Sequence, residues 1–235
     1  MNQTPSIISP IHGPAKKLSA QFVEIAGWQV PQVYLSVEKE VAAARNGVAL
    51  ADATSTGKLQ IEGQSSETVI QTTRASSPAI IGQGVISDFG HIYRLRNDQF
   101  FIHSPPGTVG SAIQRLIEVT RERSETVTVT DISHGRADLL LVGPDSPNLM
   151  SRLCGLDFHS DRFPDLSAKH SSVAKSRQLT LRHDMGEIPA YSLIGARSLG
   201  AYIWETILEA GHDLGIIPIG QSALEKLQQE NRSGV

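Results

Sequence analysis

The stretch ADATSTGKLQIEG, residues 51–63, places chemically capable side chains just ahead of a short strand pattern. The carboxylate of Asp52 accepts hydrogen bonds, and the hydroxyl of Thr54 both donates and accepts them. A turn with these groups either binds its own backbone or also lines a ligand site. The residues alone leave both interpretations open.

Tyr93 and Tyr191 offer flat aromatic faces on which a planar ring can stack. Packing in the core is the default role for such side chains, and it stays open beside the ligand role. The eight histidines have no spacing typical of a metal site, so the sequence predicts no bound metal. Ser133 precedes His134, but neighbours in sequence are not a nucleophile and base paired in space.

The helices and strands of the fold position these groups. In the sequence, the helix patterns and strand patterns do not alternate regularly. Residues 37–46, VEKEVAAARN, have an amphipathic helical pattern that ends at Gly47, and residues 57–62, GKLQIE, alternate as a strand. Residues 84–104 predict a hairpin with its turn at RND, and the polar residues 161–177 predict a surface loop. This order, without strict βαβ alternation, favours an α+β fold.

A weak internal repeat relates residues 52–71, DATSTGKLQIEGQSSETVIQ, to residues 131–150, DISHGRADLLLVGPDSPNLM. Each segment begins with Asp, reaches Thr or Ser two residues later, and continues to a short strand, a glycine and a helix pattern. We predict two related α/β halves, residues 21–130 and 131–235, after a flexible N-terminal arm at residues 1–20. The alternative is that limited turn chemistry makes unrelated units look alike.

Composition narrows the class of protein. Hydrophobic residues make up 40% of the 235 residues, which permits a sizeable core. The net charge of −3 argues against nucleic acid as the main partner, and no apolar run is long enough to span a membrane. One cysteine, Cys154, excludes an intramolecular disulfide, and the N-terminus lacks the apolar core of a signal peptide. We therefore expect a cytoplasmic protein.

ARNGVALADATSTGKLQIEG, residues 44–63, resembles the N-terminal signature of the glycine-cleavage T-protein (aminomethyltransferase) folate-binding superfamily. Further stretches similar to this family are GVISDFGHIYRL, LLLVGPDSPNLMSRL and AYIWETILEAGHDLGIIPIGQSALEKLQQE. The matching positions in the first two similar stretches are Arg45, Gly47, Asp52, Thr54, Gly57, Lys58, Gly63, Gly84, Asp88 and Tyr93.

The resemblance implies a fold of two related α/β halves around a central folate-type cleft. It also implies tetrahydrofolate as the cofactor and one-carbon transfer as the chemistry. The family's small C-terminal barrel has no counterpart before Val235, so the chain is similar to a short form.

Positions that carry catalysis in the family differ here. Gly110 stands where the resemblance places a catalytic aspartate, and a glycine cannot orient a proton transfer. In HDMGEIPAYS, Gly186 and Glu187 match, but Tyr191 stands for a glutamate that grips the pterin ring. A carboxylate accepts from two adjacent N–H donors, whereas a tyrosine has one oxygen. Leu224 replaces an arginine that would pair with the folate tail.

Two functions of different classes remain. The first is a protein of the aminomethyltransferase family that binds tetrahydrofolate or a similar planar anionic ligand, with standard catalytic residues largely missing and residual activity open. The second is a non-catalytic subunit or scaffold, similar to the gamma subunit of heterotetrameric sarcosine oxidase, that docks on a larger oxidase or a glycine-cleavage partner. The candidate ligand-binding residues are Asp52, Thr54, Asp88, Tyr93, Glu187 and Tyr191.

Overall fold

The computed structural model of the chain describes residues 7–123 and 126–233. Its contacts define two units. Unit 1 comprises Met1–Ser55, Ala137–Asp165 and His170–Val235, and unit 2 comprises Thr56–Arg136 and Leu166–Lys169. These units divide the chain at other places than the two halves expected from the sequence repeat, so those halves stay a prediction.

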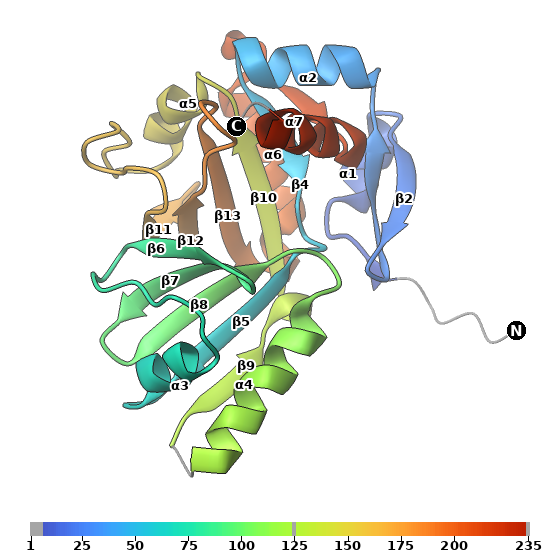
Figure 1. The fold of residues 1–235 in the computed structure, drawn as a ribbon. Coiled ribbons are helices and arrows are strands. Elements are labelled where there is room, and N and C mark those ends of the chain that lie inside the picture. Colours follow the sequence, from blue (N-terminus) through green and yellow to red (C-terminus); the bar gives the residue numbers. More distant parts are fainter. Residues whose placement is uncertain (1–6, 124–125, 234–235) are drawn as a thin grey trace, which may run out of the picture. The chain divides into compact units, whose positions relative to one another are not determined.

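Unit 1 contains two sheets and five helices among the residues that the structure describes (Figure 1). The smaller sheet has the strand order β1-β3-β2, and the larger has the order β11-β12-β13-β10-β4-β14. The strands are β1 (Ile7–Ile8), β2 (Gln21–Ile25), β3 (Trp28–Val33), β4 (Ala49–Asp52), β10 (Arg136–Val142), β11 (Ala168–Val173), β12 (Ser176–Arg182), β13 (Ala190–Ala196) and β14 (Ile217–Ile219). The helices are α1 (His12–Lys17), α2 (Val37–Asn46), α5 (Ser146–Leu153), α6 (Gly200–Ala210) and α7 (Gln221–Ser233).

The inner strands β4 and β10 of the larger sheet of unit 1 are buried on both faces. Along β10, Leu139 and Leu141 belong to one apolar cluster, while Leu140 and Val142 belong to another. The first cluster includes side chains of α1, α5 and α6, and the second includes side chains of α2 and α7. Successive side chains of a strand point to opposite faces, so an uninterrupted apolar run such as LLLV, residues 139–142, is what a sheet between two helical layers requires.

The N-terminal segment differs from our expectation of a flexible arm at residues 1–20. From Ile7 onward the chain forms β1, which pairs with β3 in parallel, and then α1. Ile11 and Ala15 are fully buried in the core of unit 1. The sequence HGPAKK has poor helix propensity, so this helix depends on burial of its apolar face. Residues 1–6 of the predicted arm lie outside the described residues.

In the part of unit 2 that the structure describes, there are a five-stranded sheet with the order β6-β7-β8-β5-β9 and two α-helices. Leu59 and Ile61 of β5 lie in its apolar cluster with Val69 and Leu116 of the helices, as their alternation in the sequence predicts. The strands are β5 (Gly57–Glu62), β6 (Gly84–Ser87), β7 (Gly90–Arg96), β8 (Gln99–Ser104) and β9 (Thr128–Asp131). The helices are α3 (Ser66–Thr72) and α4 (Val109–Arg123).

Two expectations about strands need correction. Residues 84–104 form three strands rather than one hairpin, because a second turn at Asp88 and Phe89 precedes β7. Residues 161–177 are not all loop, because residues 168–173 form β11, the edge strand of the larger sheet. Only the ends of β11 are buried, which explains its polar composition. The α+β class is confirmed.

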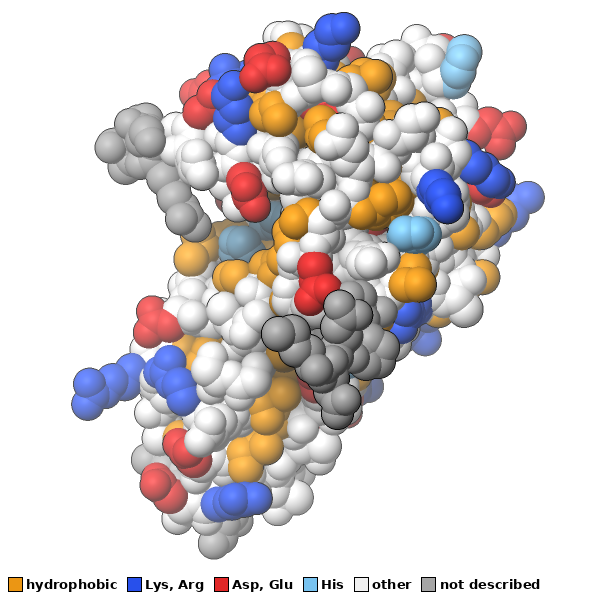
Figure 2. Space-filling view, turned by 90° about the vertical axis from the view of Figure 1, so that its right-hand side faces the viewer, with side chains coloured by type: hydrophobic (Ala, Val, Ile, Leu, Met, Phe, Trp, Pro, Cys, Tyr) orange, Lys and Arg blue, Asp and Glu red, His pale blue; other side chains and the backbone are white. Residues whose placement is uncertain are grey.

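The surface mixes both signs of charge. On the face drawn in Figure 2, Lys and Arg side chains are interspersed with Asp and Glu, so this face has no extended basic area. No helix within residues 7–123 and 126–233 is long and apolar enough to cross a membrane.

Candidate functional site

The turn that follows β4 is held by its own side chains. The Thr54 backbone N–H donates to Asp52 Oδ1 over 3.0 Å, which is the short-range turn expected of an aspartate at this place. Ser9 Oγ donates to the other carboxylate oxygen of Asp52. Both Asp52 and Thr54 are buried. The Asp52 side chain therefore fixes the turn, whatever else it contacts.

The same local geometry recurs in the second segment of the internal repeat. The Ser133 N–H donates to Asp131 Oδ1 over 2.9 Å, as the Thr54 N–H does to Asp52. In unit 1 the Asp138 N–H donates to Thr54 Oγ1 over 3.3 Å, and in unit 2 the Lys58 N–H donates to Ser133 Oγ over 2.9 Å. In both turns the Ser or Thr hydroxyl thus accepts from the next strand along its sheet.

The glycines of the repeat also correspond. Gly63 and Gly143 have φ angles of +141° and +132°, which L side chains rarely adopt. The carbonyl of each accepts the N–H of the first residue of the next helix, Ser66 or Ser146, over 3.0 Å. The two segments of the sequence repeat therefore also share the hydrogen bonds that shape their turns.

Tyr34 and Glu40 lie close to the Asp52 turn in unit 1. Glu40 is fully buried and accepts three backbone N–H groups, from Tyr34 (2.7 Å), Leu35 (2.9 Å) and Gly220 (2.8 Å). Burial raises the pKa of Tyr34 far above its usual value, and the charges of Asp52 and Glu40 raise it further. Tyr34 therefore stays neutral, and its buried hydroxyl has no hydrogen-bond partner among the residues described.

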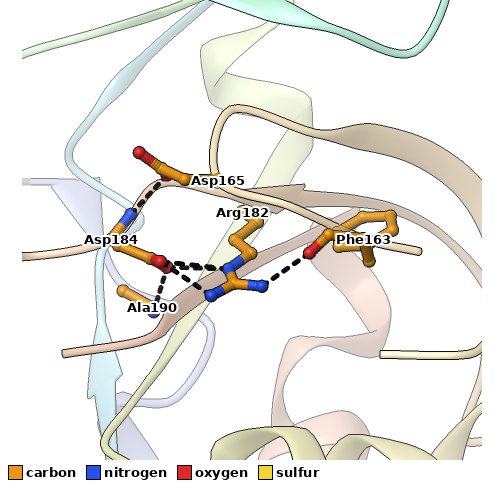
Figure 3. Close-up of polar contacts among 5 residues, drawn as sticks. All are labelled: Phe163, Asp165, Arg182, Asp184 and Ala190. Carbon is orange, nitrogen blue, oxygen red and sulfur yellow. Dashed lines mark hydrogen bonds and ion pairs between the residues drawn. The ribbon is translucent and has the colours of Figure 1, made fainter. Parts of the chain in front are cut away.

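An ion pair that we did not predict joins β12 to the turn after it (Figure 3). Arg182 Nε donates to Asp184 Oδ1 and Oδ2 over 2.9 and 3.1 Å, and Nη2 donates to Oδ2 over 2.8 Å. The two side chains are 9% and 13% exposed, so this pair is little screened by solvent. The sequence pattern that could have indicated this pair is Arg182-x-Asp184 at the end of a strand. Residues two apart in an extended chain point to the same side, so their opposite charges can meet.

The same cluster fastens a loop. Arg182 Nη1 donates to the Phe163 carbonyl over 2.6 Å, and the Asp184 N–H donates to Asp165 Oδ1 over 2.8 Å (Figure 3). Asp184 Oδ1 also accepts the Ala190 N–H over 3.1 Å, which closes the turn that carries Glu187.

Tyr191 lies inside the core of unit 1. It is fully buried, with ring centroids 5.6 Å from Phe158 and 6.3 Å from Phe163, and the guanidinium of Arg182 lies 5.6 Å from its ring. Its hydroxyl has no hydrogen-bond partner among the residues described. Burial is the main reason that the pKa of Tyr191 rises to about 12, so the hydroxyl remains neutral.

Replacing Tyr191 with Phe is expected to leave the free energy of unfolding at pH 7 equal to wild type or higher by about 1 kcal/mol, because the change removes an unsatisfied buried group. The raised pKa stabilises the folded wild type below pH 10, and this contribution is lost between pH 10 and about 12. The free energy of unfolding of the variant should therefore rise relative to that of wild type as the pH increases from 10 to about 12. Urea unfolding at pH 7 and pH 11 measures both effects, and a clear loss at pH 7 would show that the hydroxyl has a partner.

The other predicted residues lie apart within their units. Asp88 is exposed in the turn between β6 and β7, and Tyr93 is fully buried in β7 opposite Gly84, at the far end of that hairpin. Glu187 is exposed in the turn between β12 and β13. The structure thus brings together Asp52 with Thr54, and Tyr191 with Arg182.

Three positions that differ from the family pattern, Gly110, Tyr191 and Leu224, carry no charged side chain. Gly110 lies in the first turn of α4, where an added Cβ would meet nothing within 4 Å. Leu224 is buried in the core of unit 1. Across residues 7–123 and 126–233, no three His, Cys, Asp or Glu residues are grouped to hold a metal ion.

Comparison with known proteins places these observations in a family. The family model of the GCVT N-terminal domain matches residues 11–234. The aminomethyltransferase of Halothermothrix orenii is 25% identical over 98% of this chain, which spans 65% of that relative. The chain therefore covers less than two thirds of this relative's length.

Two solved structures share the fold. The aminomethyltransferase of the glycine cleavage system from Bartonella henselae superposes with a TM-score of 0.79 at 18% identity, over 97% of this chain and 63% of that one. A chain of heterotetrameric sarcosine oxidase from Corynebacterium sp. U-96 superposes with a TM-score of 0.65 at 18% identity, over 88% of this chain and 95% of that one.

Proposed function

Because the chain belongs to the GCVT N-terminal domain family, we propose that it binds tetrahydrofolate or a similar planar anionic ligand without the standard aminomethyl transfer. The family is folate-dependent in general. The observation that carries the proposal is the family match over nearly the whole described chain, supported by the fold shared with an aminomethyltransferase.

The chain's own residues fit only part of what tetrahydrofolate binding requires. Asp88 in unit 2 and Glu187 in unit 1 are exposed carboxylates that can each accept hydrogen bonds from a ligand. Thr54 is fully buried, and its hydroxyl accepts the Asp138 N–H. Tyr191 does not fit the pterin-gripping role, because it is neutral, fully buried and has one oxygen. Gly110 supplies no carboxylate for proton transfer. We therefore propose binding, with tetrahydrofolate as the first ligand to test, and derive no catalytic step.

A ligand that binds only the folded chain raises its melting temperature by mass action. Tetrahydrofolate at 100 times its dissociation constant should stabilise the fold by about 2.7 kcal/mol, a rise of roughly 5 to 10 °C for a chain of this size. Differential scanning fluorimetry measures the rise in melting temperature with tetrahydrofolate, and free glutamate serves as the matched control. An unchanged melting temperature up to millimolar tetrahydrofolate counts against the proposal.

A second candidate is a subunit role. The superposition covers 95% of the matched chain in heterotetrameric sarcosine oxidase, so a chain with nearly this extent works there within a larger assembly. On this proposal the protein docks on a larger oxidase in the cytoplasm, where its one cysteine, buried Cys154, stays reduced. Affinity purification from the native cell tests it, and recovery of the chain without any stoichiometric partner would contradict it.

A further inference from the structure

Strand β9 lies at one end of the sheet in unit 2 and pairs, among the described residues, with β5 alone (Figure 1). The strand at the opposite end, β6, is partly covered by its own chain, because the Gly84 N–H donates to the Leu166 carbonyl over 2.6 Å. An open strand edge presents backbone donors and acceptors with which another strand can pair. The edge of β9 is therefore the end of this sheet to which a further strand can add.

The sequence of β9 has little of the protection that natural edge strands carry. Such strands are commonly protected by lysine, proline or a bulge. Two edge strands of the larger sheet have one of these residues, Lys169 in β11 and Pro218 in β14. Residues Thr128–Asp131 include neither, and their pairing with β5 has no shift in register. The carboxylate of Asp131 is directed back into its own turn, where it accepts from the Ser133 N–H and hydroxyl.

The backbone bonds of β9 determine which residues face the open edge. The Ile132 N–H donates to the Lys58 carbonyl over 2.9 Å, so the backbone of Ile132 points toward β5. In an antiparallel pair, successive residues direct their N–H and C=O groups alternately toward the neighbouring strand and away from it. The backbone groups of Val127 and Val129, each an odd number of residues from Ile132, therefore point to the open edge.

Residues 126–130, TVTVT, read the same in both directions. An antiparallel copy of this segment, centred on Thr128, therefore places Thr opposite Thr and Val opposite Val. The same register brings the outward backbone groups of Val127 opposite those of Val129 in the second copy, so the two strands can exchange N–H···O bonds. Thr128 and Thr130 are exposed, and threonine pairs across two strands are favourable. Such a self-complementary edge is what a two-fold dimer requires.

We propose that β9 is a dimerisation edge, at which two copies of this chain pair their β9 strands antiparallel about a two-fold axis at Thr128. The pairing joins two five-stranded sheets into one continuous sheet. Residues 126–130 are fewer than the roughly 20 to 30 residues a side of a standard interface, so the dimer is weak and reversible. This surface belongs to unit 2 alone, and the pairing does not depend on the proposed ligand.

Sedimentation velocity of the full chain tests the dimer. Wild type should pass from monomer to dimer between about 1 µM and about 1 mM, with a dissociation constant of roughly 10 to 100 µM. Thr128→Lys places two like charges opposite each other at the axis and should weaken association at least about tenfold. Thr68→Lys is the matched control, because Thr68 is an exposed threonine of α3 in the same unit, and it should associate as wild type does.

A mixture of two variants tests the register. Thr128→Glu should be as monomeric as Thr128→Lys, whereas an equimolar mixture of the two should dimerise at least as tightly as wild type, because opposite charges then meet at the axis. Far-ultraviolet circular dichroism of both variants should match that of wild type, since Thr128 is exposed. A wild type that stays monomeric to about 1 mM would overturn the proposal, because an open self-complementary edge should associate by then. The same holds for a Thr128→Lys protein that associates as tightly as wild type, or for a mixture no more dimeric than its components.

Discussion

Replacing Glu40 with Ala is expected to lower the free energy of unfolding by about 3 to 5 kcal/mol, because a buried carboxylate holds three backbone N–H groups. The bonds tie Tyr34 and Leu35, which follow β3, to Gly220 before α7. These segments are far apart in the sequence, so one side chain fixes where the last helix begins. Urea unfolding followed by circular dichroism measures the loss.

The control for this prediction lies on the same helix. Glu38 of α2 is 76% exposed and lies 4.0 Å from Lys226 Nζ, a contact typical of weak surface ion pairs. Glu38→Ala should change the free energy of unfolding by less than about 0.5 kcal/mol. If Glu40→Ala were as mild as Glu38→Ala, the three N–H groups would have other partners and the role given to Glu40 would be wrong.

The Gly143→Ala variant should be destabilised by about 3 kcal/mol or more, or should fail to fold. Its φ of +132° is strained for any L side chain, and an added Cβ would lie 2.2 Å from the Gly47 carbonyl oxygen and 3.0 Å from that of Ala44. Both obstacles are backbone atoms of the helix end of α2, which cannot rotate away. Soluble yield and the urea midpoint of unfolding measure the effect.

Gly155→Ala is the matched control, because an added Cβ there meets nothing within 4 Å. It should leave stability within about 0.5 kcal/mol of wild type. A Gly143→Ala protein with the stability of the Gly155→Ala protein would mean that the strand-to-helix turn after β10 does not need a glycine.

Local chemistry made part of the structure predictable. The amphipathic pattern of residues 37–46 and the stop at Gly47 correspond to α2, whose bounds are Val37–Asn46. Leu59 and Ile61 face the core of unit 2 as their alternation predicts. The Asp52 turn was also foreseeable, since an aspartate bonds the N–H two residues later without help from distant chain.

Features that depend on distant partners were missed. Helix α1 forms on the unfavourable sequence HGPAKK because Ile11 and Ala15 reach the core, and burial outweighs propensity there. The contacts of the Arg182–Asp184 pair with the Phe163 carbonyl and the Asp165 carboxylate come from a distant segment, and no pattern near residue 182 reveals them. The two candidate tyrosines, Tyr93 and Tyr191, are both fully buried, which their sequence neighbours did not disclose.

We propose that this chain binds a ligand of the kind its family binds and that Tyr191 takes no part in the binding. Isothermal titration of wild type and Tyr191→Phe with tetrahydrofolate tests that claim most directly. We expect saturable binding at one ligand per chain, with a dissociation constant below about 1 mM and equal in both proteins. Absence of binding at millimolar ligand, or a markedly weaker Tyr191→Phe variant, would contradict it.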